Sequence, residues 1–371
     1  MTTETISAED LVALRDSVAD LLGRRGGSEA VRAAIASDRR TDERLWEGLT
    51  EIGAPALAIP EELGGVGAGW TGLAAVVEEV GAALAPVPLF SSAVLATGAL
   101  LVALEHNGSD DGSSVLVEAL ASGERIATLC AASEHSWDTP RVTADGGILN
   151  GTAHYVTDAE AATDLVVLAG GGPVVTLHHV PADAPGVEIR PVATMDPTRP
   201  LSEVSFTDVS ATAIGAPDDL VARVRDLVWA LLAVEQVGAA GAALRMTVEY
   251  TKERKQFGRV IGSFQAVKHM CAEMAAKNEP CRSLVWYAAH AFDAVPAEAE
   301  LVACHAKSHT GEVGRFVART ATEVHGGMGF TDLLGLHYWF KRIGFDRQVL
   351  GGPETVREEA AILQGWTARG V

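Results

Sequence analysis

Three long stretches of helical periodicity fill most of the C-terminal part of this chain, and they limit its fold more than any other feature. They cover residues 220–253, 264–292 and 297–325. A Gly-Gly pair follows the third stretch, at the position where a left-handed glycine commonly ends a helix. Long helices joined by short connections are typical of antiparallel bundles. The sequence therefore predicts an antiparallel four-helix bundle over residues 217–371.

Residues 122–216 follow a different pattern, in which short runs of Val, Ile, Thr and Leu alternate with turn residues. Residues 145–147 (Asp-Gly-Gly) and 150–151 (Asn-Gly) lie between such runs, and these dipeptides are the strongest local signals of a β-hairpin. About six or seven short strands fit into this region. We predict a small β-sandwich or β-barrel domain here.

The N-terminal residues 1–121 are rich in Ala and Leu, with apolar residues at three- and four-residue spacing, as in Leu11, Leu14, Val18, Leu21 and Leu22. This spacing places an apolar stripe on one face of a helix. The order of helices, strands and bundle predicts an α+β protein that is mostly α. Its parts are an N-terminal helical domain (1–121), a middle β-domain (122–216) and the bundle (217–371).

The composition excludes several classes of function. The chain has 371 residues, with 29 Lys and Arg against 49 Asp and Glu, and a formal net charge of −20. Nucleic-acid affinity rests on Lys and Arg that neutralise phosphates, so nucleic acid is not an expected partner. The apolar run at residues 227–234 is far shorter than the roughly 20 residues of a membrane helix, and the polar N-terminus lacks the pattern of a signal peptide. The 4 cysteines have no metal-site spacing, so we expect a cytoplasmic protein without a metal centre or a membrane partner.

Residues 250–258 form the densest polar cluster, at the end of the first long helical stretch. Arg254 presents a planar fork of donors that suits a pyrophosphate better than a lysine does, and Gln256 adds a neutral donor beside it. Ser263 is placed to cap the next helix. The alternative is a solvated helix end that is stabilised by charge pairs at i,i+4 spacing.

Two further clusters contain residue types that suit a ligand. Residues 323–331 are rich in glycine, which allows the backbone to approach another surface closely, although a helix cap and a turn explain them as well. Residues 130–134 and 149–158 bring small and hydroxyl-bearing side chains to strand ends, where they would line a ring-shaped ligand. Hairpin turns and cross-strand Thr pairs are the alternative interpretation there.

Taken together and in this order, the clusters resemble the acyl-CoA dehydrogenase family. Residues 253–274 (ERKQFGRVIGSFQAVKHMCAEM) are similar to that family's RxQFGxxIxxFQ signature, and residues 323–331 are similar to its QxxGGxGxT element. Residues 148–169 resemble its LNGxKxWITNA hairpin, and Pro60 with the two glycines at 64–65 resembles its P-E-x-x-GG loop. The resemblance covers essentially the whole chain.

The resemblance implies a dimer of dimers, with FAD bound between the β-domain of one subunit and the bundles of two. It implies that a carboxylate removes the α-proton of an acyl-CoA thioester while the β-hydrogen leaves as hydride to the flavin. Electrons then pass to an electron-transfer flavoprotein. Carried over residue by residue, the FAD contacts are Arg254, Gln256, Phe257, Gln265, Glu323, Gly326, Gly327, Ala131, Ser133, Tyr155 and Thr157.

The chain departs from the family pattern where the base is expected. Homomeric members usually carry a Glu in the turn that Gly351 occupies here, and a second known position of the base falls at Val228. Neither residue can take a proton, so we predict no catalytic residue in this chain. Tyr155 stands where the family has a Trp that shields the flavin. Glu323, which would repel a pyrophosphate, stands where the family has a Gln.

With these departures the chain resembles the base-less subunit of heteromeric actinobacterial acyl-CoA dehydrogenases, some of which act on steroid-CoA thioesters. We therefore expect FAD-dependent α,β-dehydrogenation of an acyl-CoA in β-oxidation, with a partner chain of the same fold that supplies the Glu. Two alternatives stay open. One is a non-catalytic flavoprotein or acyl-CoA-binding scaffold, and the other is a homomeric dehydrogenase with a relocated base such as Glu235.

Overall fold

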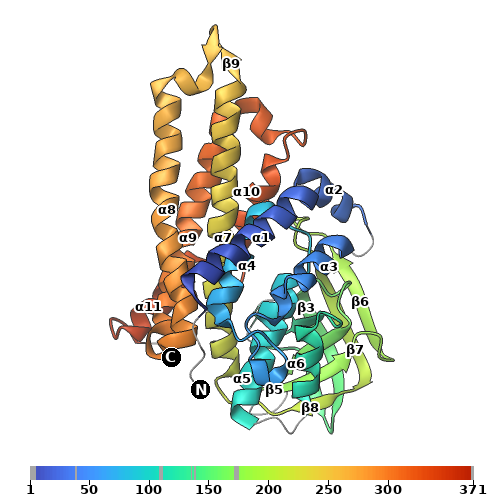
Figure 1. Ribbon diagram of the computed structural model, residues 1–371. Coiled ribbons are helices and arrows are strands. Elements are labelled where there is room, and N and C mark those ends of the chain that lie inside the picture. The colour runs from blue at the N-terminus through green and yellow to red at the C-terminus, as the bar shows by residue number, and fades with distance from the viewer. Residues whose placement is uncertain are drawn as a thin grey trace.

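The structure is a computed structural model and describes residues 6–37, 40–107, 112–134, 136–137, 139–170 and 175–368. Its elements follow the predicted order of N-terminal helices, β-domain and helical bundle (Figure 1). The bundle extends well beyond the rest of the molecule and carries strand β9 at its tip, whereas the β-domain lies beside the opposite end of the bundle (Figure 1). The two ends of the bundle therefore have different surroundings.

Capping side chains fix the starts of two N-terminal helices. The Ser7 hydroxyl accepts a hydrogen bond from the backbone N–H of Asp10 at 3.1 Å. The Asp42 carboxylate accepts from the backbone N–H groups of Arg44 and Leu45 at 3.0 and 3.1 Å. The elements of this part are α1 (Ala8–Arg25), α2 (Ser28–Ile35), α3 (Glu43–Glu51), the 3-10 turns η1 (Ala54–Ala56) and η2 (Glu61–Leu63), α4 (Gly69–Ala83), the π-helix η3 (Phe90–Ala96), α5 (Thr97–Asn107) and α6 (Ser113–Ala121).

Two four-stranded sheets form the β-domain, as expected for a sandwich. The first has the strand order β1-β4-β5-β8, with β1 parallel to β4, and the second has the antiparallel order β2-β3-β7-β6. Strand β4 is buried on both faces, because Val166 and Leu168 pack into the helical core while Leu165 and Val167 face the core between the sheets. The strands, more than the six or seven expected, are β1 (Ala127–Cys130), β2 (Thr143–Asp145), β3 (Ile148–Thr157), β4 (Asp164–Ala169), β5 (Thr176–Pro181), β6 (Val187–Val192), β7 (Leu201–Ser210) and β8 (Thr212–Ile214).

One of the two turn predictions was wrong. The β2–β3 hairpin turns at residues 146–147 as predicted, but Asn150 and Gly151 lie inside β3. Gly151 has a φ of +124°, and a Cβ atom there would lie 2.4 Å from the Arg141 carbonyl oxygen. Close backbone packing therefore requires this glycine. The Asn150 side chain bonds Asp208 on β7 instead, with 3.2 Å between Nδ2 and Oδ1.

The bundle begins with α7, whose bounds are those predicted from the sequence. A short hairpin of β9 and β10 joins α7 to α8. The cap prediction at Ser263 was wrong, because Phe264 is the N-cap of α8 and the Ser263 hydroxyl donates to the Val260 carbonyl oxygen at 2.7 Å. The elements are α7 (Leu220–Glu253), β9 (Lys255–Gln256), β10 (Arg259–Val260), η4 (Ile261–Ser263), α8 (Gln265–Ala294), α9 (Pro296–His325), η5 (Gly326–Phe330), α10 (Leu336–Gln348) and α11 (Pro353–Leu363).

Helix α7 is long and apolar enough to cross a membrane by length and composition, but 89% of its most apolar window is buried within the protein. Its apolar side chains pack against α4, α8, α9 and α10. Glycines allow α4 and α7 to approach closely. A Cβ atom at Gly238 would lie 2.0 Å from the Glu78 carbonyl oxygen, and one at Gly81 would lie 2.5 Å from that of Glu235. This close contact fixes the position of Glu235 in the molecule.

Candidate functional site

An apolar cavity of about 70 Å³ lies where the β-domain meets α7 and α10. Tyr155 lines this cavity and is 51% exposed, so the cavity reaches the molecular surface there. Strand residues form one wall, while α7, α10 and the turn after α10 contribute the other. The lining residues are Phe90, Leu95, Leu129, Ala131, Ala132, Trp137, His154, Tyr155, Thr157, Arg199, Val228, Leu232, Phe345, Val349 and Leu350.

Of the two positions at which the family resemblance places a base, Val228 lines this cavity, and Gly351 directly follows the lining residue Leu350. Val228 is 1% exposed and lines the cavity from α7. Beside it, the Trp229 indole N–H donates to the Leu350 carbonyl oxygen at 2.9 Å, which holds the turn after α10 against α7. Gly351 in this turn has a φ of +113°, a conformation that L side chains rarely adopt. Among the described residues that line the cavity, none is Asp or Glu.

Three of the four strand residues predicted to flank a flavin line this cavity, namely Ala131, Tyr155 and Thr157. The backbone N–H of His154 donates to the Ala132 carbonyl oxygen at 2.9 Å, which joins β3 to the segment after β1. A bulge in β3 gives Tyr155 a φ of +55°. The structure thus brings these strand residues together around one cavity.

Ser133, the fourth predicted strand residue, is not among the lining residues. Its side chain is buried in a local turn, where the hydroxyl donates to the Ser136 carbonyl oxygen at 2.8 Å and accepts from the Ser136 backbone N–H at 3.0 Å. Its contact with FAD stays a prediction.

The predicted FAD contacts that follow α7 and begin α8 lie at the tip of the bundle. Arg254 caps α7 and Gln256 lies in β9, and both side chains are exposed. Phe257 is 92% exposed with a φ of +53°, and it packs edge-on against Phe264 with 6.2 Å between ring centroids. Gln265 is the first residue of α8. An exposed phenylalanine in a strained backbone indicates a surface that another molecule covers.

The predicted residues at the end of α9 are also exposed. Gly326 has a φ of +59°, as a glycine cap requires, but its ψ of −139° lies outside the left-handed helical region that we predicted. A Cβ atom at Gly326 or Gly327 would meet no described atom within 4 Å, so packing inside the described chain does not explain the glycine at 327. Glu323 is exposed. His325 is buried, with its ring stacked on Tyr250 at 4.3 Å, and burial lowers its pKa.

Within one chain, the predicted FAD contacts fall into two groups. Arg254 and Gln256 lie at the tip of the bundle, whereas Tyr155 lies in the β-domain at the other end (Figure 1). Val228, at the cavity, precedes Arg254 by 254 − 228 = 26 residues along the same helix, and such a length of helix spans about 39 Å. One chain therefore does not place both groups at one cavity.

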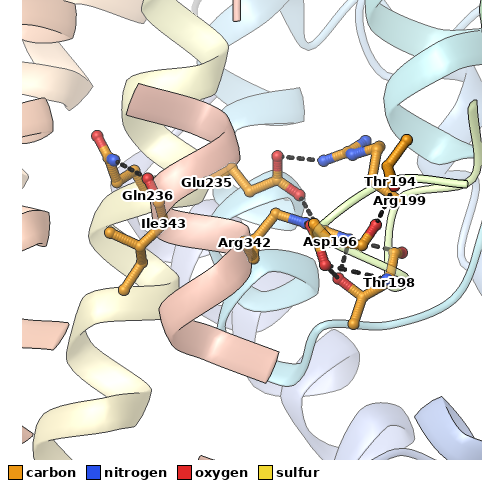
Figure 2. Close-up of polar contacts among 8 residues, drawn as sticks. All are labelled: Thr194, Asp196, Thr198, Arg199, Glu235, Gln236, Arg342 and Ile343. Carbon is orange, nitrogen blue, oxygen red and sulfur yellow. Dashed lines mark hydrogen bonds and ion pairs between the residues drawn. The ribbon is translucent and has the colours of Figure 1, made fainter. Parts of the chain in front are cut away.

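A buried ion-pair cluster, defined here as Asp196, Thr198, Arg199, Glu235 and Arg342, is drawn in Figure 2. It shares Arg199 with the lining of the cavity. Arg342 contacts Asp196 Oδ2 through Nε and Glu235 Oε1 through Nη1, each at 2.9 Å. Its Nη2 donates to the carbonyl and hydroxyl oxygens of Thr198 at 2.7 and 2.8 Å. Arg199 pairs with the second oxygen of Glu235. The cluster joins the segment before β7 to α7 and α10.

Lys307 and Asp346 are two further buried ionisable residues near this cluster. Lys307 is 1% exposed and donates from Nζ to the Asp346 carbonyl oxygen. Asp346 is fully buried, and neither oxygen of its carboxylate has a hydrogen-bond partner among the described residues. Burial lowers the pKa of Lys307 to about 7 and raises that of Asp346 well above its usual value. Both shifts favour the uncharged forms.

The buried ion-pair cluster was not predicted from the sequence. Glu235 was considered as a relocated base, but its partners Arg199 and Arg342 lie 36 and 107 residues away. No short-range sequence pattern indicates an ion pair between residues so far apart in the chain. Because guanidinium groups engage both of its carboxylate oxygens, Glu235 is not a free carboxylate in this structure.

An N-terminal helical domain, a β-sandwich and an antiparallel bundle, packed around an apolar cavity, define the acyl-CoA dehydrogenase fold. The chain belongs to the acyl-CoA dehydrogenase family. The family model described as acyl-CoA dehydrogenase, N-terminal domain, matches residues 8–124, and the one described as acyl-CoA dehydrogenase, C-terminal domain, matches residues 230–361. The resemblance noted in the sequence is thereby confirmed.

Individual relatives cover almost the whole chain. The acyl-CoA dehydrogenase IpdE2 of Mycobacterium tuberculosis is 38% identical over 94% of this chain and 95% of its own length. The solved structure of a variant of the Tcur3481-Tcur3483 steroid ACAD matches with a TM-score of 0.86 and 30% identity over 98% of this chain and 99% of that one. The ChsE4-ChsE5 complex from Mycobacterium tuberculosis matches with a TM-score of 0.87 and 28% identity over the same shares.

Proposed function

We propose that this chain is the base-less subunit of a heteromeric, FAD-dependent acyl-CoA dehydrogenase, and that a partner of the same fold supplies the catalytic Glu. The cavity wall carries this proposal. By the family resemblance, the base would stand at Val228, which lines the cavity, or at Gly351, which follows the lining residue Leu350, and no Asp or Glu is among the described lining residues. Removal of an α-proton needs a carboxylate in a dry pocket. Glu235, the candidate for a relocated base, is held by two arginines.

The relatives support both the heteromeric state and the substrate class in this proposal. One similar structure is described as a steroid ACAD named by two chains, and another as a complex of two chains. By this similarity, we propose that the complex acts on an acyl-CoA thioester with a bulky, steroid-like group. The proposal includes an electron-transfer flavoprotein as electron acceptor and a cytoplasmic location.

The exposed residues at the tip suit a cofactor that is shared between subunits. When bound, FAD supplies the acceptor for the β-hydrogen of the thioester. Arg254 is exposed and makes no ion pair among the described residues, so its guanidinium is available to a pyrophosphate. Gly326 and Gly327 leave open space for an approaching molecule. Glu323 is the one predicted contact whose charge opposes a pyrophosphate.

The distance along α7 supports an assembly of at least two subunits. The tip carries Arg254 and the cavity carries Tyr155, and about 39 Å of helix separates the two regions within one chain. We propose that the tip of this chain completes a FAD site whose cavity belongs to the partner. The partner's cavity then contains the Glu that this chain lacks.

Co-expression with a Glu-bearing partner of the same fold tests the proposal. We expect a yellow complex that reduces a ferrocenium acceptor with an acyl-CoA, while this chain alone shows negligible turnover. Replacing the partner's base by Gln should abolish the activity of the complex. Ordinary turnover by this chain alone would overturn the proposal, and a complex that forms without any turnover would favour the scaffold alternative.

A matched pair of variants tests the role of the tip. Arg254→Ala should release FAD from the complex, because the pyrophosphate loses its planar donor group. Lys252→Ala is the control, since Lys252 is an exposed cation of the same segment that is paired with Glu249 at 2.6 Å. Retention of full FAD content in the Arg254 variant would show that the tip does not bind the cofactor.

A further inference from the structure

We infer that the cavity of this chain binds a small apolar group that ends in a neutral hydrogen-bond acceptor, such as a ring ketone, and that Arg199 binds the acceptor. The inference rests on the proposed function, because a cavity that lacks the catalytic base binds such a group without converting it to product. The cavity then selects ligands by the contact with Arg199 within a largely apolar wall.

Arg199 belongs to both the buried ion-pair cluster and the cavity wall. Its side chain is 5% exposed, and its guanidinium carbon lies 4.9 Å from the centroid of the Phe90 ring, which also lines the cavity. One terminal nitrogen pairs with Glu235, but Nε has no hydrogen-bond partner among the described residues. A buried donor without an acceptor is costly, so an acceptor in the cavity would be bound favourably.

The charges around Arg199 favour a neutral acceptor over a carboxylate. Arg199 and Arg342 are matched by Glu235 and Asp196 within the buried ion-pair cluster. Asp158 is a further buried carboxyl close to Arg199, and burial raises its pKa. The cationic charge is therefore already balanced, and an anionic ligand would enter an apolar cavity without a free counter-charge.

The rest of the wall limits the ligand to a small hydrocarbon group. Leu95, Leu129, Leu232 and Phe345 are among the apolar lining residues. The volume of about 70 Å³ is several times the roughly 10–15 Å³ that one water requires. It suits a single small ring or the branched end of an acyl chain. His154, Tyr155 and Thr157 are the other polar residues of the lining. A largely apolar wall with a few polar groups is the usual design of a small-molecule site.

A buried water is the competing explanation for the unpaired donor. A second cavity of about 10 Å³ has Arg199, Asp158, Glu235 and Arg342 among its lining residues, and it approaches the volume that one water needs. A water there would satisfy Arg199 Nε without any ligand. In that case, the apolar cavity would not discriminate between ligands that differ only in an acceptor.

A matched pair of ring compounds distinguishes these explanations. Cyclopentanone carries a carbonyl oxygen where methylenecyclopentane carries a CH₂ group of similar shape, and their binding to the full chain is measured by calorimetry. Arg199→Met removes the donor and leaves Glu235 paired with Arg342. We expect the ratio of ketone to alkene affinity to fall about tenfold or more in this variant. An unchanged ratio would overturn the inference.

A measurement on the unmodified chain covers the case in which the variant does not fold. The infrared C=O stretch of bound cyclopentanone should lie below its frequency in hydrocarbon solvent, because the guanidinium N–H donates to the carbonyl oxygen. A stretch at the hydrocarbon value would overturn the inference. Val349→Phe, which fills the cavity from the α10 side, should abolish binding of both compounds, and binding that persists would place the ligand elsewhere.

These assays contain neither FAD nor a partner subunit. Failure of the ligand selectivity therefore leaves the dehydrogenase proposal untouched. Conversely, failure of the complex to turn over an acyl-CoA leaves the binding result valid.

Discussion

Arg342 of α10 and Glu235 of α7 form an ion pair at 2.9 Å, with their side chains 3% and 2% exposed. The two helices also supply Phe345 and Val228 to the cavity wall. The ion pair therefore fixes the spacing of two elements that shape the site. Because removing one member of such a pair leaves the other charge buried, the pair makes the packing of α7 on α10 specific.

Glu235→Gln should destabilise the chain by about 3–5 kcal/mol, because Arg199 and Arg342 would lose their shared carboxylate in a buried site. Urea unfolding followed by circular dichroism measures this change. Glu354→Gln is the control, since Glu354 is 70% exposed and its loss should cost within about 0.5 kcal/mol.

The same variant bears on the relocated base. In complex with the partner, a folded Glu235→Gln protein should retain turnover, because both carboxylate oxygens of Glu235 are bound by arginines in the unmodified chain. Complete loss of activity with normal folding and FAD content would instead favour Glu235 as the base.

Asp346→Asn should stabilise the chain increasingly as the pH rises. Burial raises the pKa of Asp346 above its ordinary value of 3.8. At a pH between 3.8 and this raised pKa, the carboxyl group holds a proton in the folded state and has released it in the unfolded state. Stability therefore falls with rising pH in this window, by at most about 1.4 kcal/mol per pH unit, and Asn removes that loss. The measurement is urea unfolding at about pH 4.5, 5.5 and 6.5. All three pH values lie below the Lys307 pKa of about 7.

Asp183→Asn, which removes an exposed carboxylate, is the control for this series. An Asp346→Asn variant whose advantage shrinks with rising pH would contradict the sign derived from the buried carboxyl.

Gly351→Ala should destabilise the chain by about 1–3 kcal/mol, because the φ of +113° is strained for any residue with a Cβ atom. A steric clash is not the cause of this loss, since the nearest atoms to that Cβ would lie 3.6–3.8 Å away. Gly344→Ala is the matched control: it lies on α10 with no atom within 4 Å and should gain about 0.5–1 kcal/mol. Equal effects of both changes on the unfolding free energy would contradict the role of the backbone.

Phe257→Ser should weaken assembly with the partner while changing the stability of the single chain by less than about 1 kcal/mol, since the ring is 92% exposed. Sedimentation velocity of the complex and thermal melting of the chain separate the two effects. Val115→Ser on α6, where the valine is 68% exposed, should change neither. If the Phe257 variant assembles with unchanged affinity, the tip is not part of the interface.

Local sequence patterns predicted the structure correctly where an element's own residues determine its conformation. Helix α7 has the bounds predicted from the sequence, because no proline interrupts residues 220–253 and its apolar residues pack on all sides of its central part. The Asn-Gly pair at 150–151 failed as a turn signal, because the pairing of β3 with β7 and the close backbone at Arg141 override the local preference. Ser263 failed as a cap for a related reason, since its hydroxyl bonds the Val260 carbonyl oxygen within the preceding turn.

Residue identity and local periodicity were enough to predict the order of helices, strands and bundle, the family, and the absence of a titratable side chain at Val228 and Gly351. Two features became visible only once the elements were packed together: Arg342 pairs with Asp196 across 146 residues, and Arg199 lines an apolar cavity. The same structure separates Arg254 from the cavity by the length of α7. Pairing of buried charges and the distance between two ends of a bundle arise from how elements pack, and no local spacing in a chain encodes them.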